Sequence, residues 1–156
     1  MMQINEFMIR DVVKIEEHVT VKELLEILVA NKIGGVPVVD KQGNLQGMIS
    51  DGDVIRFLQP QGRTIYDIYT LVLVSEQQDL KDKLQSSIHL PVVDMMKKQK
   101  LYSVKPNDKL EKALEILAEH GFKKIPVVND AGRVVGVISR GDLIRYISNQ
   151  LIKELD

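Results

Sequence analysis

GMISDGDVIRFL (Gly47–Leu58) occurs a second time, 89 residues further along the chain, as GVISRGDLIRYI (Gly136–Ile147). Extended back to His18 and Asn107, the two copies align over 41 positions without a gap, and 15 of these positions are identical. A repeat of this length that occurs only twice indicates two domain-sized units in tandem rather than a solenoid. Two similar units normally pack about a pseudo-twofold axis, which directs attention to the surface between them.

The composition is that of an ordinary globular protein and excludes several classes of function. The chain has 156 residues, 44% hydrophobic and 28% charged, with a formal net charge of −1, so electrostatics gives no reason to expect nucleic acid as a partner. The absence of cysteine excludes disulfides and thiol chemistry. The N-terminus lacks the apolar core of a signal peptide, and no run approaches 18 apolar residues. We therefore expect a soluble, cytoplasmic protein with no membrane insertion.

The first copy predicts a helix, two strands and a second helix. Thr20 and Glu23 have capping-box spacing ahead of an apolar face that repeats with the helical period, and Gly34 with Gly35 is expected to end that helix. Strands are predicted at 36–39 and 45–49, joined by a turn at 40–44, followed by a helix at 52–58. Residues 12–19 suggest an extended edge strand.

The second copy repeats the same pattern. Asp108 and Glu111 open a predicted helix that Gly121 closes, strands follow at 125–128 and 134–138, and a final helix covers 142–152. Residues 61–90 have no counterpart in either copy. There Ile65, Ile68, Leu71 and Val72 suggest an amphipathic helix, and 76–83 a polar helical stretch, so we interpret this segment as a helical insertion.

The segment Gly-x-Ile-Ser-x-Gly-Asp, at 47–53 and again at 136–142, carries the chemistry. A serine that ends a strand and an aspartate that opens a helix place a hydroxyl and a carboxylate beside free backbone N–H groups. Such a helix start attracts anions, and a carboxylate can accept both hydrogen bonds of a ribose diol, which suits a nucleotide. The alternative is structural, because Ser-x-x-Asp before an apolar run is also a capping box. The two interpretations are compatible.

In these segments the chain resembles the CBS (cystathionine β-synthase-type) domain family, in the tandem arrangement called a Bateman module. The resemblance covers the chain apart from about residues 60–90, and it includes the Val/Ile-Pro-Val-Val-Asp/Asn strand and both Ser-x-x-Asp segments. It implies an α/β (α+β) fold of two β-α-β-β-α units about a pseudo-twofold axis. The units would cover 1–60 and 91–156, with the helical insertion at 61–90.

The resemblance also implies two clefts that bind adenosine-containing ligands, with the ribose on the Asp of one unit and the adenine against the backbone before the Pro-containing strand of the other. The first cleft would use Ser139, Arg140, Asp142, Thr20, Gly34, Gly35, Val36 and Pro37. The second would use Ser50, Asp53, Phe122, Lys123, Lys124, Ile125 and Pro126.

The two clefts differ in charge. Arg140 in the first corresponds to Asp51 in the second, whereas Lys123 and Lys124 correspond to Gly34 and Gly35. An arginine can bind phosphate through two parallel hydrogen bonds, so we expect the cleft with Arg140 to be the tighter site. Arg56 and Arg145, one turn into each helix, can reach phosphate or pair with a nearby carboxylate.

The leading hypothesis is a regulatory sensor that binds AMP, ADP or ATP, signals to an effector protein by a conformational change and forms a homodimer. S-adenosylmethionine, NAD and cyclic di-AMP remain open as ligands. The alternative is a scaffold for protein–protein contact with vestigial clefts. We expect no enzyme activity, catalytic residue, catalytic cofactor or metal site, since the sequence shows no nucleophile with a base and the three histidines are scattered.

Overall fold

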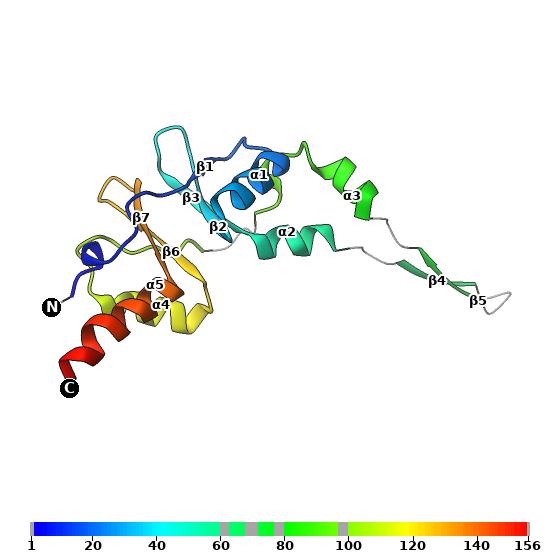
Figure 1. The fold of residues 1–156 in the computed structure, drawn as a ribbon. Coiled ribbons are helices and arrows are strands. Elements are labelled where there is room, and N and C mark those ends of the chain that lie inside the picture. Colours follow the sequence, from blue (N-terminus) through cyan, green and yellow to red (C-terminus); the bar gives the residue numbers. More distant parts are fainter. Residues whose placement is uncertain (1, 60–62, 68–71, 77–79, 97–99, 156) are drawn as a thin grey trace. The chain divides into compact units, whose positions relative to one another are not determined.

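The computed structural model describes residues 2–59, 63–67, 72–76, 80–96 and 100–155 (Figure 1). The chain divides into two compact units, which we describe separately. Unit 1 comprises Met1–Glu17, Gly35–Met48 and Lys98–Asp156, and unit 2 comprises His18–Gly34 and Ile49–Lys97.

Unit 1 contains most of the second repeat. Strands β6 (Lys124–Val128) and β7 (Val134–Ser139) form an antiparallel hairpin, in the register Lys124↔Ser139 and Ile125↔Ile138. Helix α4 (Leu110–His120) precedes the hairpin and ends at Gly121, whose φ of 63° is the left-handed conformation that glycine adopts readily. Helix α5 (Arg140–Tyr146) follows it and continues as a π-helical segment (Ile147–Ile152) and a short 3-10 turn (Lys153–Leu155).

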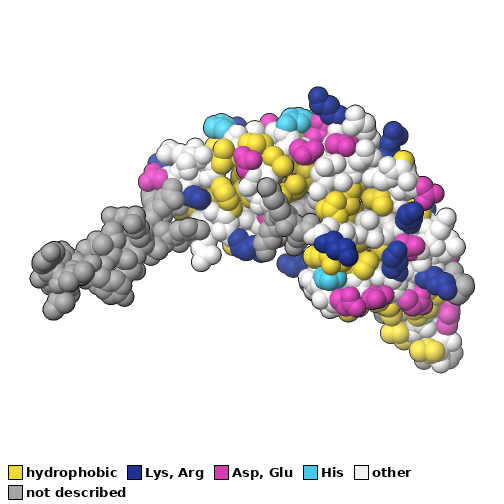
Figure 2. All heavy atoms as spheres, turned by 180° about the vertical axis from the view of Figure 1, so that it is seen from behind, with side chains coloured by type: hydrophobic (Ala, Val, Ile, Leu, Met, Phe, Trp, Pro, Cys, Tyr) yellow, Lys and Arg dark blue, Asp and Glu magenta, His cyan; other side chains and the backbone are white. Residues whose placement is uncertain are grey.

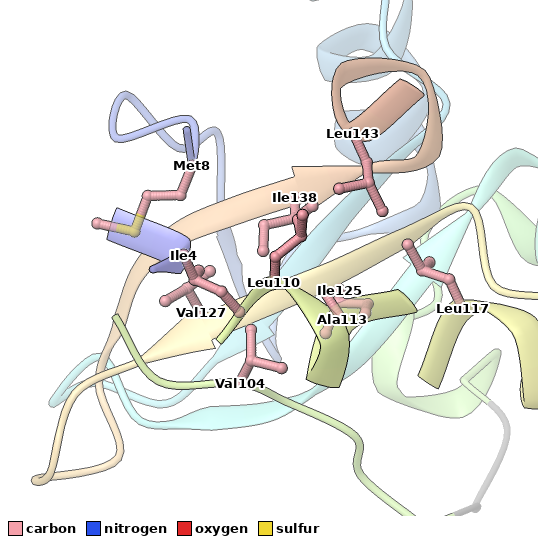
Figure 3. Close-up of a cluster of buried hydrophobic side chains, with 10 residues drawn as sticks. All are labelled: Ile4, Met8, Val104, Leu110, Ala113, Leu117, Ile125, Val127, Ile138 and Leu143. Atoms are coloured by element: carbon pink, nitrogen blue, oxygen red, sulfur yellow. The ribbon is translucent and has the colours of Figure 1, made fainter. Parts of the chain in front are cut away.

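The core of unit 1 lies between these helices and the hairpin (Figure 3). Every second residue of each strand points toward one face of the hairpin, and the apolar residues of α4 fall on one face of that helix. These two faces pack against each other. The cluster consists of Ile4, Met8, Val104, Leu110, Ala113, Leu117, Ile125, Val127, Ile138 and Leu143. Its helix and strand members come from the second repeat, whereas Ile4 and Met8 come from the N-terminus.

The N-terminal segment (residues 2–9) therefore completes the second repeat rather than the first. Its backbone forms hydrogen bonds from Ile4 N to Asp108 O (2.9 Å), from Leu110 N to Met2 O (3.1 Å) and from Ile9 N to Val137 O (2.9 Å). The approach is close at Gly136, where a Cβ would lie 2.7 Å from Met8 Sδ and 3.2 Å from Ile9 O. In Figure 1 this blue segment runs beside β7.

Unit 2 shows the reciprocal arrangement. Helix α1 (Val21–Asn31) is followed in this unit by α2 (Asp51–Leu58) and α3 (Leu80–Ser87). The segment before the second repeat, residues 88–96, lies against the first repeat, through Val21 N to Leu90 O (2.9 Å) and Val92 N to Val19 O (2.8 Å). These bonds are the counterparts of Leu110 N to Met2 O and Ile4 N to Asp108 O, so the repeats exchange their leading segments.

Within unit 1 the turns of the two repeats meet through a reciprocal pair of bonds. Strand β2 (Gly35–Val39) lies between the short β1 (Ile15–Glu16), which is parallel to it, and β3 (Leu45–Ser50). Leu45 N donates to Gly132 O and Val134 N to Gly43 O, both at 3.1 Å. Leu45 corresponds to Val134 and Gly43 to Gly132 in the repeat, so the two bonds are equivalent to each other, as a local twofold axis requires, and the expected pseudo-symmetry is confirmed here.

Three predicted elements need correction. The first helix ends at Asn31, where Lys32 adopts φ 52°, and not at Gly34 and Gly35. The final helix begins at Arg140, and α-helix gives way to π-helix after Tyr146.

The predicted amphipathic helix of the insertion is wrong where the structure describes it. Arg63–Asp67 (β4) and Val72–Glu76 (β5) form an antiparallel hairpin, in which Ile65 pairs with Val74. The first segment contains Thr64, Ile65 and Tyr66 and the second Val72 and Val74, and this β-propensity outweighs the spacing that suggested a helix. Ile68, Tyr69 and Leu71 lie outside the described residues. Of the polar helical stretch predicted at 76–83, residues 80–83 are helical in α3 (Leu80–Ser87), Glu76 ends β5, and 77–79 lie outside the described residues.

Candidate functional site

Each repeat places its Ser and Asp where a strand turns into a helix. At the β7–α5 junction, Ser139 Oγ donates to Asp142 Oδ2 (2.5 Å) and accepts from Asp142 N (3.1 Å). At the β3–α2 junction, Ser50 N (2.9 Å) and Ser50 Oγ (3.2 Å) both donate to Asp53 Oδ2. The capping interpretation therefore holds in both copies, because each pair satisfies groups at its own helix start.

The arginine one turn further along each helix binds the same aspartate. Arg145 pairs with Asp142 Oδ1, and Arg56 pairs with Asp53 Oδ1. The sequence leaves two roles open for these arginines, phosphate binding or pairing with a carboxylate. The structure shows the pairing. The arginines themselves remain exposed, with 69% of the Arg145 side chain and 53% of the Arg56 side chain accessible to solvent.

Asp142 is the more accessible of the two carboxylates, since 25% of its side chain is exposed against 12% for Asp53. The hydrogen bond from Ser139 lowers the pKa of Asp142, burial opposes this, and the bond and charge of Arg145 with the charge of Lys124 lower it further. Asp142 is thus ionised at neutral pH. A carboxylate has about four lone-pair positions, so two remain for a ligand after Ser139 and Arg145 are counted.

Lys124 joins this group to the first repeat. It is the register partner of Ser139 in the β6–β7 hairpin, and its Nζ donates to the carbonyl of Gly35, 3.2 Å away at the start of β2. We call Gly35, Lys124, Ser139 and Asp142 the unit-1 site. Lys124 is one of the residues predicted for the second cleft, but its ammonium donates to Gly35, which is predicted for the first.

The other residues predicted for the first cleft have varied surroundings. Val36 and Pro37 are buried in β2 beside Gly35, and Arg140 is exposed at the start of α5, where its N–H donates to Lys123 O (2.9 Å). Thr20 and Gly34 lie in unit 2. There Thr20 Oγ1 caps α1 by accepting from Glu23 N (3.2 Å), and Gly34 O accepts from Asp51 N (2.8 Å).

The residues predicted for the second cleft are divided between the units. Ser50 and Asp53 lie in unit 2. In unit 1, Ile125 and Pro126 are buried in β6, and Lys123 is exposed just before it.

Phe122 belongs to an aromatic cluster that short-range sequence patterns do not reveal. Its ring centroid lies 5.5 Å from those of both Tyr102 and His120, which are themselves 4.0 Å apart, and Lys100 Nζ lies 5.4 Å from the centre of Tyr102. The cluster joins two short segments, Lys100 with Tyr102 and His120 with Phe122, that lie on either side of α4 in the sequence, so no local motif could have indicated that they meet.

The described part of the face shown in Figure 2 has no dominant charge. On the face shown in Figure 2, basic and acidic side chains lie intermixed, in keeping with the net charge of −1. Among the described residues, no group of three or more His, Asp or Glu side chains could hold a metal ion. No helix in the described part of the chain has the length and apolar character needed to cross a membrane.

Comparison with known proteins gives a consistent result. The model of the CBS domain matches twice, at residues 4–60 and 92–149. The uncharacterized protein MJ1426 of Methanocaldococcus jannaschii is 27% identical over 155 residues, which cover 94% of this chain and 91% of that protein. The chloroplastic CBS domain-containing protein CBSX1 of Arabidopsis thaliana is 33% identical over 151 residues, or 91% of this chain and 62% of the plant protein.

A solved structure shows the same fold with a ligand. The crystal structure of CBSX2 in complex with AMP is 26% identical to this chain and superposes with a TM-score of 0.70, over 97% of this chain and 98% of that one. AMP is the ligand of that protein, and its ribose and phosphate are the two chemical groups that the Ser-x-x-Asp segments are expected to bind.

Proposed function

Because the chain belongs to the CBS domain family, with two CBS domains in tandem, we propose that it is a regulatory module that binds an adenine nucleotide of the AMP, ADP or ATP type. The observation that carries this proposal is the unit-1 site, where an ionised, partly exposed aspartate lies next to an ammonium group and a strand carbonyl. The ligand seen in CBSX2 supports it.

Each group of the unit-1 site has a role in this proposal. Asp142 accepts hydrogen bonds from the ribose hydroxyls with the lone pairs that Ser139 and Arg145 leave unused. The backbone next to Gly35 and Val36 reads the edge of the adenine. Arg140, exposed and adjacent to Ser139, binds phosphate.

We propose regulation rather than catalysis, because the residues assigned to the site bind and orient without supplying a nucleophile or an acid–base pair. A ligand shifts a conformational equilibrium only if it binds the two states with different affinity. The module would therefore report nucleotide levels to an effector protein, or through the geometry of a homodimer, in the cytoplasm.

Two structural facts support a homodimer formed through helices. Ile55 on α2 and Ile144 on α5 occupy equivalent positions of the two repeats, and 68% and 63% of these residues are exposed. Their equivalent placement on α2 and α5, rather than their exposure alone, is what suggests burial against a second copy.

Isothermal titration calorimetry with AMP, ADP and ATP tests the nucleotide proposal. We expect binding to the wild-type protein and a loss of at least tenfold in affinity for Asp142→Ala, because hydrogen bonds to a charged group contribute about 1.5–3 kcal/mol. Asp53→Ala is expected to lose less, given its smaller exposed fraction, and Asp130→Ala, on a turn with 94% of its side chain exposed, serves as the matched control.

The outcomes separate the alternatives. Equal losses for Asp142→Ala and Asp53→Ala would contradict the ranking of the two sites. No binding of any adenine nucleotide, with S-adenosylmethionine, NAD and cyclic di-AMP included in the panel, would favour the scaffold that the sequence left open.

A further inference from the structure

We infer that the hairpin of the insertion joins two copies of the chain, because the free edge of β4 pairs antiparallel with β4 of a second copy about a twofold axis at Ile65. The hairpin consists of β4 (Arg63–Asp67) and β5 (Val72–Glu76), and neither strand pairs with a third one in the described part of the chain. A ribbon of two strands is marginally stable in water, and further strands stabilise it. A second copy of the hairpin supplies them.

The sequence of β4, Arg-Thr-Ile-Tyr-Asp, is complementary to itself in the antiparallel direction. When Ile65 lies opposite Ile65 of the second copy, Arg63 lies opposite Asp67 twice, once on either side of the axis. Residues two apart in a strand share a face, so the charged residues lie on the same face as Ile65. Opposite charges in directly opposite positions stabilise a pair of strands, and no other antiparallel register of β4 pairs these two charges.

The same register extends the rows that the hairpin already contains. Ile65 is the register partner of Val74, so two copies place four β-branched residues in one row across four strands. Such residues fit the pleated surface of a sheet. In the neighbouring row of the same face, Arg63 is the register partner of Glu76 and comes to lie between it and Asp67 of the second copy. The charges of the two hairpins thus alternate in sign where they meet.

The other edge of the hairpin lacks this complementarity. Two antiparallel β5 strands centred on Val74 place Glu76 opposite Val72, so each acidic residue lies opposite an apolar one. Edge strands that avoid pairing often carry lysine or proline, and β4 contains neither. Its charges stand at its two ends, where a second copy neutralises both. The free edge of β4 is therefore the one that accepts a second copy.

Disulfide trapping tests the inference, because the chain has no cysteine of its own. Directly opposite residues of antiparallel strands have Cα atoms about 4.5–5.5 Å apart, a separation that a disulfide spans. Ile65→Cys places its thiol at this position. Val74→Cys is the matched control, because its two copies lie about 14 Å apart, three strand spacings. With copper phenanthroline as oxidant, we expect Ile65→Cys to form covalent dimers at least about tenfold faster, since a disulfide does not bridge Cα atoms more than about 7 Å apart.

Charge reversal tests the register. In the Ile65→Cys background, Arg63→Asp and Asp67→Arg each place like charges opposite one another, so each should slow the trapping by about fivefold or more. A mixture of the two variants restores both pairs of opposite charge. We therefore expect a mixed covalent dimer, identified by its mass, to form at the rate of the parent variant. Thermal unfolding of each variant checks that the fold is retained.

Equal rates for Ile65→Cys and Val74→Cys, or faster trapping through Val74→Cys, would overturn the inference. A mixture of the charge variants that reacts no faster than its components would overturn it as well. Trapping is preferred to sedimentation here, because one pair of five-residue strands is small beside the roughly 1,200–2,000 Å² that stable interfaces bury. None of these outcomes bears on the nucleotide proposal, since the unit-1 site contains no residue of the hairpin.

Discussion

Replacing Ile4 with alanine tests whether the N-terminal segment is part of the core of the second repeat. Ile4 is completely buried and lies in the cluster formed by α4, β6 and β7 (Figure 3). The substitution removes three carbon atoms, worth about 2.4 kcal/mol at roughly 0.8 kcal/mol per buried methylene. The cavity left behind adds to this, so we expect the free energy of unfolding to fall by about 3–4 kcal/mol.

Urea denaturation followed by circular dichroism measures this loss, and the slope with denaturant shows whether the cooperative unit has changed. Ile152→Ala is the matched control, because 52% of that residue is exposed on the π-helical segment, and it should cost about 1 kcal/mol or less. A loss below about 1 kcal/mol for Ile4→Ala would show that residues 2–9 are not docked as described.

Two further predictions concern the charge of Asp142 and the exposed helix faces. Because the folded-state pKa of Asp142 lies below the ordinary value of 3.8, its ionised form stabilises the protein above that pH, and this contribution is lost as the pH falls through the lowered pKa. The difference in unfolding free energy between the wild-type protein and Asp142→Asn should therefore be larger at pH 6 than at pH 3, and a difference independent of pH would contradict the assignment. For the homodimer, Ile144→Glu should give a monomer in analytical ultracentrifugation where the wild-type protein sediments as a dimer, and a wild-type monomer would refute the proposal.

The local structure was predictable because each repeat carries its own signals. The strands at β2, β3, β6 and β7 and the close of α4 at Gly121 follow from short-range patterns. The Ser-x-x-Asp pairs could be placed at helix starts for the same reason. The Ser139–Asp142 and Ser50–Asp53 contacts that result are local, between residues three apart.

The parts that could not be predicted depend on contacts between distant residues. Ile4 lies in the segment that precedes the first repeat, and Val92 in the segment that precedes the second. No local pattern shows that Ile4 packs on the second repeat and Val92 on the first. The same holds for Lys124, whose partner Gly35 is fixed by how the repeats meet about their local axis. In the insertion, the spacing from Ile65 to Val72 fits a helix as well as two strands, and β-propensity decides between them.

The exchange of leading segments has a consequence for biosynthesis. Residues 2–9 are synthesised well before the helix and hairpin that receive them, since Ile4 bonds to Asp108 and Ile9 to Val137. A cut at the midpoint of the chain would separate each repeat from the segment that completes it, so neither half would be a self-sufficient fragment. Closure of this unit waits until β7 has been made, and the loop that must close runs from Ile9 to Val137.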